Sequence, residues 1–272
     1  MLTTRRLVIT SCLLVLTGTL ALAHDMFLKP AQFFLAENAT LDLALLNGTF
    51  SKSENSIERK RLLDISVLGP AGRFHVDTSQ WKATGDTSFM SLKVGAAGTY
   101  VIGVSTRPNM IALKAEEFNA YLKDDGIPDI LAARTKDGEL KTASRERYHK
   151  HVKAMVQVGE ARSEHFSTAL GYPAEIIPIN NPYSLKVGGT LRFKTVVDGK
   201  PMAGQYVLYG GRTPSGGRIE MKNLRSGADG SAEIRLTTAG TWYIKFINMT
   251  KLANDPEANY ESKWATLTFA VK

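Results

Sequence analysis

Short segments in which apolar and polar residues alternate recur along the chain, and no other feature constrains its fold as strongly. Side chains on an extended strand point alternately to two faces, so this pattern is typical of strands with one buried face. In the first part of the chain the clearest segments are residues 41–45, 65–68, 90–94 and 99–104. Glycine, proline and asparagine lie between them and favour turns. The sequence therefore predicts antiparallel sheets and an N-terminal β-sandwich over residues 24–112.

The alternating pattern returns in the last part of the chain. It covers residues 175–179, 190–197, 205–209, 219–224, 232–236, 241–247 and 264–271. Between two of these segments, Asp198-Gly199 is a dipeptide that favours the tight turn of a hairpin. Seven short strands with regular turns are typical of an immunoglobulin-like β-sandwich, which we predict over residues 171–272.

Residues 113–170 have the spacing of helices instead. Two sets of residues show it, namely Phe118, Tyr121 and Leu122, and then Tyr148, Val152, Met155 and Val156. Apolar residues three and four positions apart form one face of a helix. We therefore predict a helical insertion or linker between two immunoglobulin-like β-sandwich domains, in a fold that is mainly β.

The N-terminus has the organisation of a cleaved signal peptide. Arg5 and Arg6 give a positive start, residues 7–22 carry no charge, and Ala21-Leu22-Ala23 has the small-x-small form that signal peptidase accepts. The uncharged stretch is shorter than the roughly 20 residues of a transmembrane helix. We therefore expect residues 1–23 to be removed, the mature chain to begin at His24, and the protein to be periplasmic. The two arginines leave both Sec and twin-arginine export open.

Composition limits the chemistry of the mature chain. Cys12 is the only cysteine and lies in the expected signal peptide, so any metal must be bound through nitrogen, oxygen or methionine sulfur. The formal net charge of +8 comes from scattered lysines and arginines, which argues against nucleic acid as a partner. The sequence has no phosphate-binding glycine loop, no Gly-x-Ser-x-Gly elbow and no His-Glu-x-x-His motif. Hydrolase and nucleotide chemistry therefore lack support.

His24 is the first candidate metal ligand. A histidine that begins a chain offers its α-amine and its imidazole Nδ1, which together can chelate one cation. Such nitrogen donors suit nickel, cobalt, copper and zinc. The simpler interpretation is that signal peptidase leaves some residue first and that a histidine is there by chance. One residue does not complete a metal site, so further ligands are required.

His151 and Glu261 are the other two candidate ligands. On the predicted helix, His149 and His151 lie on different faces, so at most one can reach the ion. We prefer His151 because it shares a face with Met155, although a structural role is the alternative. Glu261 precedes the last predicted strand, where it could instead pair with a lysine on the sheet surface. The predicted metal ligands are therefore His24, His151 and Glu261.

Several segments together resemble one known family. They are Ala23 to Pro30, Tyr148 to Gly159, Glu175 to Tyr183, Asp198 to Pro201 and Glu261 to Phe269. In this combination the chain resembles the DUF4198 family, which is described as a periplasmic component of nickel or cobalt uptake systems. The resemblance implies that His24 is a functional position and that Lys150, Glu175, Lys200 and Glu261 lie in shared motifs. Many relatives carry a histidine near Asn248-Met249, so the metal or its affinity could differ in this chain.

Three functions follow as hypotheses. The leading one is a protein without enzymatic activity that captures Ni(II) or Co(II), or else copper, and supports its uptake through a transporter in the inner membrane. The second is a copper oxidase of the polysaccharide monooxygenase type, which needs a second histidine and exposed aromatics; Trp81, Trp242 and Trp264 are the available tryptophans. The third is a structural or carbohydrate-binding sandwich, by analogy of fold alone.

Overall fold

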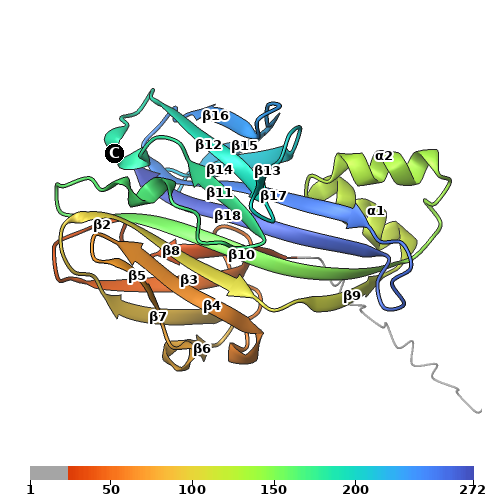
Figure 1. The fold of residues 1–272 in the computed structure, drawn as a ribbon, viewed down its shortest axis with the longest axis horizontal. Helices are drawn as coiled ribbons and strands as arrows, with labels where there is room; N and C mark the ends of the chain where they lie inside the picture. Colours follow the sequence, from red (N-terminus) through yellow and green to blue (C-terminus); the bar gives the residue numbers. More distant parts are fainter. Residues whose placement is uncertain (1–23) are drawn as a thin grey trace, which may run out of the picture.

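The computed structural model describes residues 24–272, which form a mainly β fold, as predicted (Figure 1). Its centre is a ten-stranded sheet. Eight strands follow in the spatial order β15 (Arg218–Arg225), β14 (Tyr206–Arg212), β17 (Gly240–Lys251), β18 (Tyr260–Val271), β10 (Ser144–Val158), β8 (Gly98–Thr106), β4 (Leu62–Gly69) and β5 (Gly72–His75). Two further strands, β2 (Phe34–Leu35) and β9 (Asn109–Leu113), pair with β10.

Two four-stranded sheets accompany the central sheet. The first contains β1 (Asp25–Pro30), β3 (Thr40–Gly48), β7 (Thr87–Lys93) and β6 (Lys82–Thr84). The second contains β11 (Ala174–Pro178), β12 (Thr190–Val197), β13 (Lys200–Pro201) and β16 (Ser231–Arg235). In Figure 1 the N-terminal strands lie below the long central strands and the second sheet lies above them. The first sheet and the central sheet enclose one core, around Leu43 and Ile102. The second sheet and the central sheet enclose the other, around Phe193 and Trp242.

The central sheet joins the two halves of the chain through β10. This strand pairs in parallel with β18, from Glu146 opposite Tyr260 to Ala154 opposite Thr268, and antiparallel with β8. Its residues therefore contribute to both cores, with Val152 in one and Met155 in the other. Because one sheet runs through both halves, a division into two separate immunoglobulin-like sandwiches is not confirmed.

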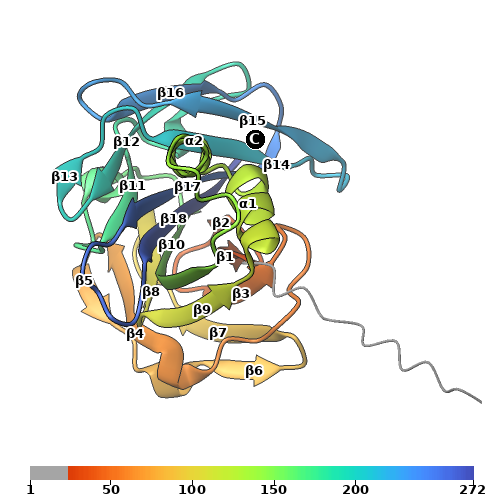
Figure 2. The same cartoon turned by 90° about the vertical axis from the view of Figure 1, so that its right-hand side faces the viewer.

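The helical prediction is half correct. Two helices, α1 (Ala115–Asp124) and α2 (Pro128–Lys136), lie together at one end of the central sheet (Figure 2). Phe118, Tyr121 and Leu122 are buried on α1, as their spacing predicts.

The second predicted helix, around Tyr148 to Val156, is wrong, because this segment belongs to the strand β10. A central strand is buried on both faces, so its apolar residues form a near-continuous run that also satisfies helical spacing.

Other local predictions agree with the structure. Asp198 and Gly199 have φ angles of 48° and 75°, and they join Val197 to Lys200 in a hairpin of β12 and β13. Positive φ at both central residues is what this kind of turn requires. Within residues 24–272, four short 3-10 helices complete the elements, namely η1 (Arg59–Arg61), η2 (Thr78–Gln80), η3 (Glu164–Ser167) and η4 (Pro182–Ser184).

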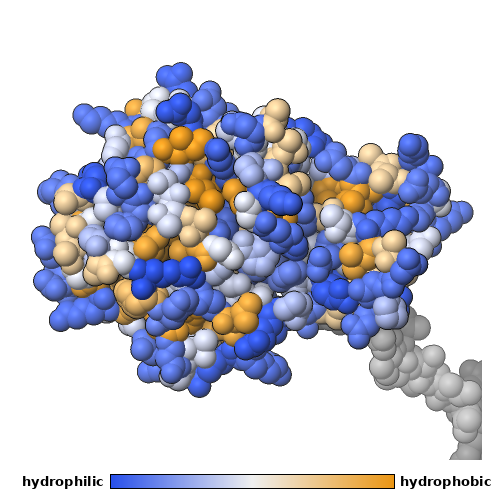
Figure 3. Space-filling model, in the orientation of Figure 1, coloured by the Kyte–Doolittle hydropathy of each residue, from blue (hydrophilic) through white to orange (hydrophobic). Residues whose placement is uncertain are grey.

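The surface of the described residues is mostly hydrophilic on the face drawn in Figure 3, and hydrophobic residues gather there only in small separate patches. Among residues 24–272, no helix has the length and apolar character needed to cross a membrane.

Candidate functional site

Strand pairing holds His24 at the start of the described chain. It directly precedes β1, and its neighbour Asp25 pairs with Gly48 at the end of β3. The segment after β3 folds back, since the N–H of Glu54 donates to the carbonyl of Asn47 at 2.9 Å. This turn brings the Glu54 side chain to the ring of His24.

The His24 imidazole and the Glu54 carboxylate form a close pair. Nε2 of His24 lies 2.5 Å from Oε2 of Glu54, and the two side chains are 20% and 43% exposed. Metal-binding histidines usually donate the N–H of one ring nitrogen to a carboxylate or carbonyl, which orients the ring and leaves the other nitrogen for the metal. With Nε2 paired in this way, Nδ1 is the ring nitrogen of His24 that can bind a metal. Nδ1 is also the nitrogen that can form a chelate with an α-amine.

Lys150 adjoins His24 from β10. Its Nζ donates to the backbone carbonyl of His24, and the residue is 4% exposed. The ring centroids of Trp264 and Tyr148 lie 4.7 and 5.4 Å from this ammonium, so both aromatic faces can stabilise its charge. Burial lowers the pKa of Lys150 to about 8, although nearby carboxylates favour its charged form.

Two of these carboxylates, those of Asp25 and Asp125, share a second buried lysine. Nζ of Lys245 lies 2.5 Å from Oδ2 of Asp25 and 3.3 Å from Oδ1 of Asp125. Burial raises the pKa of Asp125 to about 6 in spite of this cation. Burial lowers the pKa of Lys245, but the two carboxylates outweigh it and the net change is upward. The strand that follows His24 is therefore fixed by a buried ion pair.

The third carboxylate is that of Glu146, which has one unpaired oxygen. Its Oε1 accepts hydrogen bonds from the Tyr121 hydroxyl at 3.1 Å and from the Ser262 hydroxyl. Its Oε2 is buried and has no hydrogen-bond partner among the described residues. Burial raises the pKa of Glu146 to about 7, against the effect of the two hydrogen bonds.

Two neighbouring cavities share part of their walls beside His24. The smaller, of about 70 Å³, is lined by His24 and Glu146 among others. The larger, of about 350 Å³, shares Asn47, Tyr148 and Lys150 with it. The candidate site thus combines a histidine–carboxylate pair with space for a small ligand.

His151 lies on the opposite face of β10 from Lys150, because successive residues of a strand alternate. Its Nδ1 is 2.9 Å from Oγ of Ser105, and its ring centroid is 5.9 Å from that of Tyr172. The residue is 1% exposed, and burial lowers the pKa of its imidazole to about 3. His151 is therefore enclosed between sheets and does not reach His24.

Glu261 also lies on the face of the sheet that carries His151. It pairs in register with Arg147, and its Oε1 is 3.6 Å from Nε2 of His149. The rings of His149 and His151 share this face with centroids 5.4 Å apart, so the expectation that they lie on different faces is wrong. The structure does not bring the three predicted ligands together. Across residues 24–272, no group of three or more histidine, cysteine, aspartate or glutamate side chains is arranged to hold a metal.

Glu175, which the family resemblance singled out without a role, holds a loop in place. Its two oxygens accept hydrogen bonds from the backbone N–H groups of Leu170, Gly171 and Tyr172, at 2.8 to 3.0 Å. Oε2 also lies 2.9 Å from Nζ of Lys153, and both side chains are almost completely buried. Every strong interaction that this carboxylate can make is satisfied, so its role is structural.

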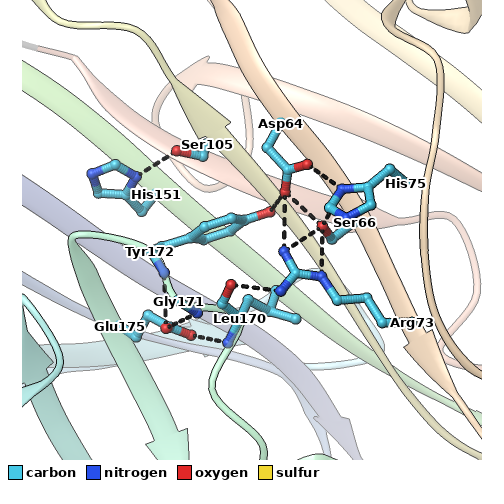
Figure 4. A network of polar contacts seen from close by, with 10 residues as sticks. All are labelled: Asp64, Ser66, Arg73, His75, Ser105, His151, Leu170, Gly171, Tyr172 and Glu175. Carbon is cyan, nitrogen blue, oxygen red and sulfur yellow. Dashed lines mark hydrogen bonds and ion pairs between the residues drawn. The ribbon is translucent and has the colours of Figure 1, made fainter.

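A polar network at β4 and β5 ties this loop to the N-terminal half (Figure 4). Asp64 accepts a hydrogen bond from the Tyr172 hydroxyl at 2.7 Å, and its Oδ1 lies 2.6 Å from Nδ1 of His75. Oγ of Ser66 lies 3.3 Å from the same Nδ1. A nucleophilic triad needs the two ring nitrogens for two different partners, so Ser66, His75 and Asp64 do not form one.

Comparison with known proteins identifies the family. Residues 21–250 match the family described as "Domain of unknown function (DUF4198)". The chain belongs to the DUF4198 family. No curated protein matches it.

Solved structures show only weak likenesses to this DUF4198 chain. A DUF4785 family protein from Legionella pneumophila is 9% identical, with 80% of this chain and 50% of that one covered and a TM-score of 0.24. A tetra-tandem repeat from the extending region of a large adhesion protein is 13% identical, with 90% and 48% covered and a TM-score of 0.22. A two-domain fibronectin type-III segment of chicken tenascin is 9% identical, with 88% and 98% covered and a TM-score of 0.20. The chain spans about half the length of the first two, and TM-scores this low do not establish a shared fold.

Proposed function

We propose that this DUF4198 protein binds a divalent transition metal in the periplasm, nickel or cobalt with copper as a further option, and supports its uptake through an inner-membrane transporter. The observation that carries the proposal is the pairing of His24 Nε2 with Glu54. It leaves Nδ1 to bind the ion together with the α-amine that cleavage after Ala23 would create. The cleavage prediction falls outside the described residues and is part of the proposal.

The proposed site offers few protein donors, which suits a protein that passes its metal on. His24 supplies two nitrogens, and Glu54 orients the ring. Structural zinc sites, for comparison, are closed by four protein ligands, whereas a site with an open position can take a water or a substrate. His151 and Glu261 lie on the other face of the central sheet and are not part of this proposed site.

The oxidase and carbohydrate-binding alternatives have less support. Both would use exposed aromatic side chains to hold a polysaccharide. Trp81, Trp242 and Trp264 are 2%, 1% and 3% exposed, so no tryptophan offers a binding platform on the described surface. The exposed aromatic residues Phe74 and Phe89 belong to β5 and β7, which are in different sheets.

Calorimetric titration with Ni(II) tests the proposal on protein that begins at His24. We expect His24→Ala to weaken binding by more than about 100-fold, beyond the 10- to 100-fold loss that removal of an outer-shell partner causes. One glycine added before His24 should also weaken binding strongly, because the α-amine becomes an amide. His165→Ala, at a histidine in η3, should leave the affinity unchanged. Equal affinities with and without the added glycine would show that the α-amine is not a ligand.

A further inference from the structure

The larger cavity beside His24 is a groove with a positive wall. It has a volume of about 350 Å³, within the range of about 300–1,000 Å³ that is typical of small-molecule sites. Its charged wall residues are Glu58, Lys60, Arg61 and Lys150. The groove therefore carries three cations and one acid.

The acid is already paired. Oε2 of Glu58 lies 2.6 Å from Nζ of Lys60, and both side chains are exposed. Neither Arg61 nor Lys150 has a carboxylate within 4.0 Å among the described residues. Two cations on the groove wall are thus left without an acidic neighbour in contact.

Of these two cations, Arg61 has the fewer interactions, because Lys150 already donates to the His24 carbonyl. Its Nε is buried and has no hydrogen-bond partner in the described part of the chain. Its guanidinium carbon lies 5.4 Å from the ring centroid of Tyr148, so the aromatic ring supports one face of the group. A buried donor without a partner costs about 1–3 kcal/mol, and a guanidinium binds a carboxylate through two parallel hydrogen bonds. The residue as a whole is partly exposed and lines the groove, so a carboxylate in the groove would pair with the accessible part of this guanidinium.

We propose that the groove binds the carboxylates of a small organic acid that chelates the metal, so that the ion arrives at His24 as a complex. This inference rests on the proposed function. His24 supplies two nitrogens, and carboxylate oxygens of the chelator fill positions that the protein leaves open. Lys150, whose Nζ donates to the His24 carbonyl, lines both cavities and connects the two parts of the site. The buried carboxylate of Glu146 lines only the smaller cavity.

Equilibrium dialysis with Ni(II) and radiolabelled citrate tests the inference on protein that begins at His24. We expect one citrate to be retained with each Ni(II). Arg61→Gln should lower the affinity for citrate at least tenfold while the affinity for Ni(II) alone stays the same. Ser56→Glu, which adds a negative charge to the groove wall, should have the same effect without altering Arg61. Arg235→Gln, at an exposed arginine of β16, is the matched control and should retain citrate normally.

Three results would overturn the inference while leaving the proposed function intact. In the first, the unmodified protein binds Ni(II) but citrate only competes for the ion and is not retained. In the second, Arg61→Gln and Ser56→Glu retain citrate as well as the unmodified protein does. In the third, citrate is retained equally with and without Ni(II), which would indicate an anion site unconnected with the metal. Absence of Ni(II) binding both with and without citrate would instead refute the proposed function.

Discussion

Two buried lysines of β10 have very different surroundings. Lys153 contacts Glu175 at 2.9 Å, and this carboxylate also accepts three backbone hydrogen bonds. Lys150, three residues earlier and on the opposite face, contacts no carboxylate within 4.0 Å among the described residues and lines two cavities. Nearby, one buried carboxylate oxygen of Glu146 has no hydrogen-bond partner among residues 24–272.

The difference separates a structural ion pair from a candidate binding site. A fully satisfied buried carboxylate holds the structure around it and has no capacity left for a ligand. Buried polar groups without partners are unfavourable in the folded protein, so their presence beside a cavity points to a ligand that completes them. The comparison therefore predicts that changes around Glu175 affect mainly stability, and that changes around His24 and Lys150 affect mainly binding.

The largest effect on stability is expected for Glu175→Ala. The change leaves the Lys153 ammonium and the buried backbone N–H groups of Leu170 and Tyr172 without their acceptor. Breaking a buried ion pair in this way costs about 3–5 kcal/mol of the free energy of unfolding. Urea unfolding followed by circular dichroism measures it. Glu233→Ala, at an exposed glutamate of β16, is the control and should change the free energy by less than about 0.5 kcal/mol.

Glu146 should make stability depend on pH in an unusual direction. Burial raises its pKa from 4.5 to about 7, so between these values the folded protein holds a proton that the unfolded chain has released. The free energy of unfolding therefore falls as the pH rises from about 4.5 to 7, by about 3 kcal/mol from this group. Glu146→Gln should remove that slope and be more stable than the unmodified protein at pH 8. Identical slopes for the two proteins, measured by urea unfolding from pH 4 to 8, would contradict the prediction.

Glu54→Gln should weaken Ni(II) binding by about 10- to 100-fold with little change in stability. The neutral amide is a weaker partner for the Nε2 proton of His24, so the ring is less firmly oriented and its Nδ1 is less basic. Titration calorimetry and thermal unfolding separate the two effects. Glu220→Gln, at an exposed glutamate of β15, should bind Ni(II) like the unmodified protein. An unchanged affinity for Glu54→Gln would remove Glu54 from the proposed site.

Only a small effect on stability is expected for Lys150→Met, in contrast to Glu175→Ala. Methionine fills a similar volume and removes the unfavourable burial of an ammonium, which offsets the lost hydrogen bond to the His24 carbonyl. We expect a change of about 1 kcal/mol or less in the free energy of unfolding. A loss as large as that of Glu175→Ala would show that Lys150 is as structural as Lys153, and the comparison would fail.

Much of the fold could be predicted from the sequence. Alternating residues located the strands that have one exposed face, such as β7, and turn chemistry located the hairpin at Asp198-Gly199. The strand β10 could not be recognised in the same way, because most of it is buried on both faces and its apolar residues do not alternate. The pairing of β10 with β18, which joins the two halves, is a contact between distant segments and has no local signal.

The candidate site was predictable in part. The choice of His24 as a candidate ligand rests on the predicted signal peptide. Glu54 reaches His24 only through the turn after β3, which no local pattern identifies. The incorrect helix prediction also concealed which residues of this segment belong to the site. If residues 144–158 are read as a strand, Glu146, Tyr148 and Lys150 lie on one face. The charged residues within this otherwise apolar segment were the feature of the sequence that could have identified the site.

The parallel pairing of β10 with β18 has a consequence for the emerging polypeptide. Strands paired in parallel cannot be joined by a hairpin, and the chain between these two forms most of the C-terminal half. Until β18 has been translated, one edge of β10 lacks its hydrogen-bonding neighbour along Glu146 to Ala154. An unpaired strand edge can add a strand from another molecule and start aggregation. Between the appearance of β10 and that of β18, this edge is therefore a point at which the nascent protein can aggregate.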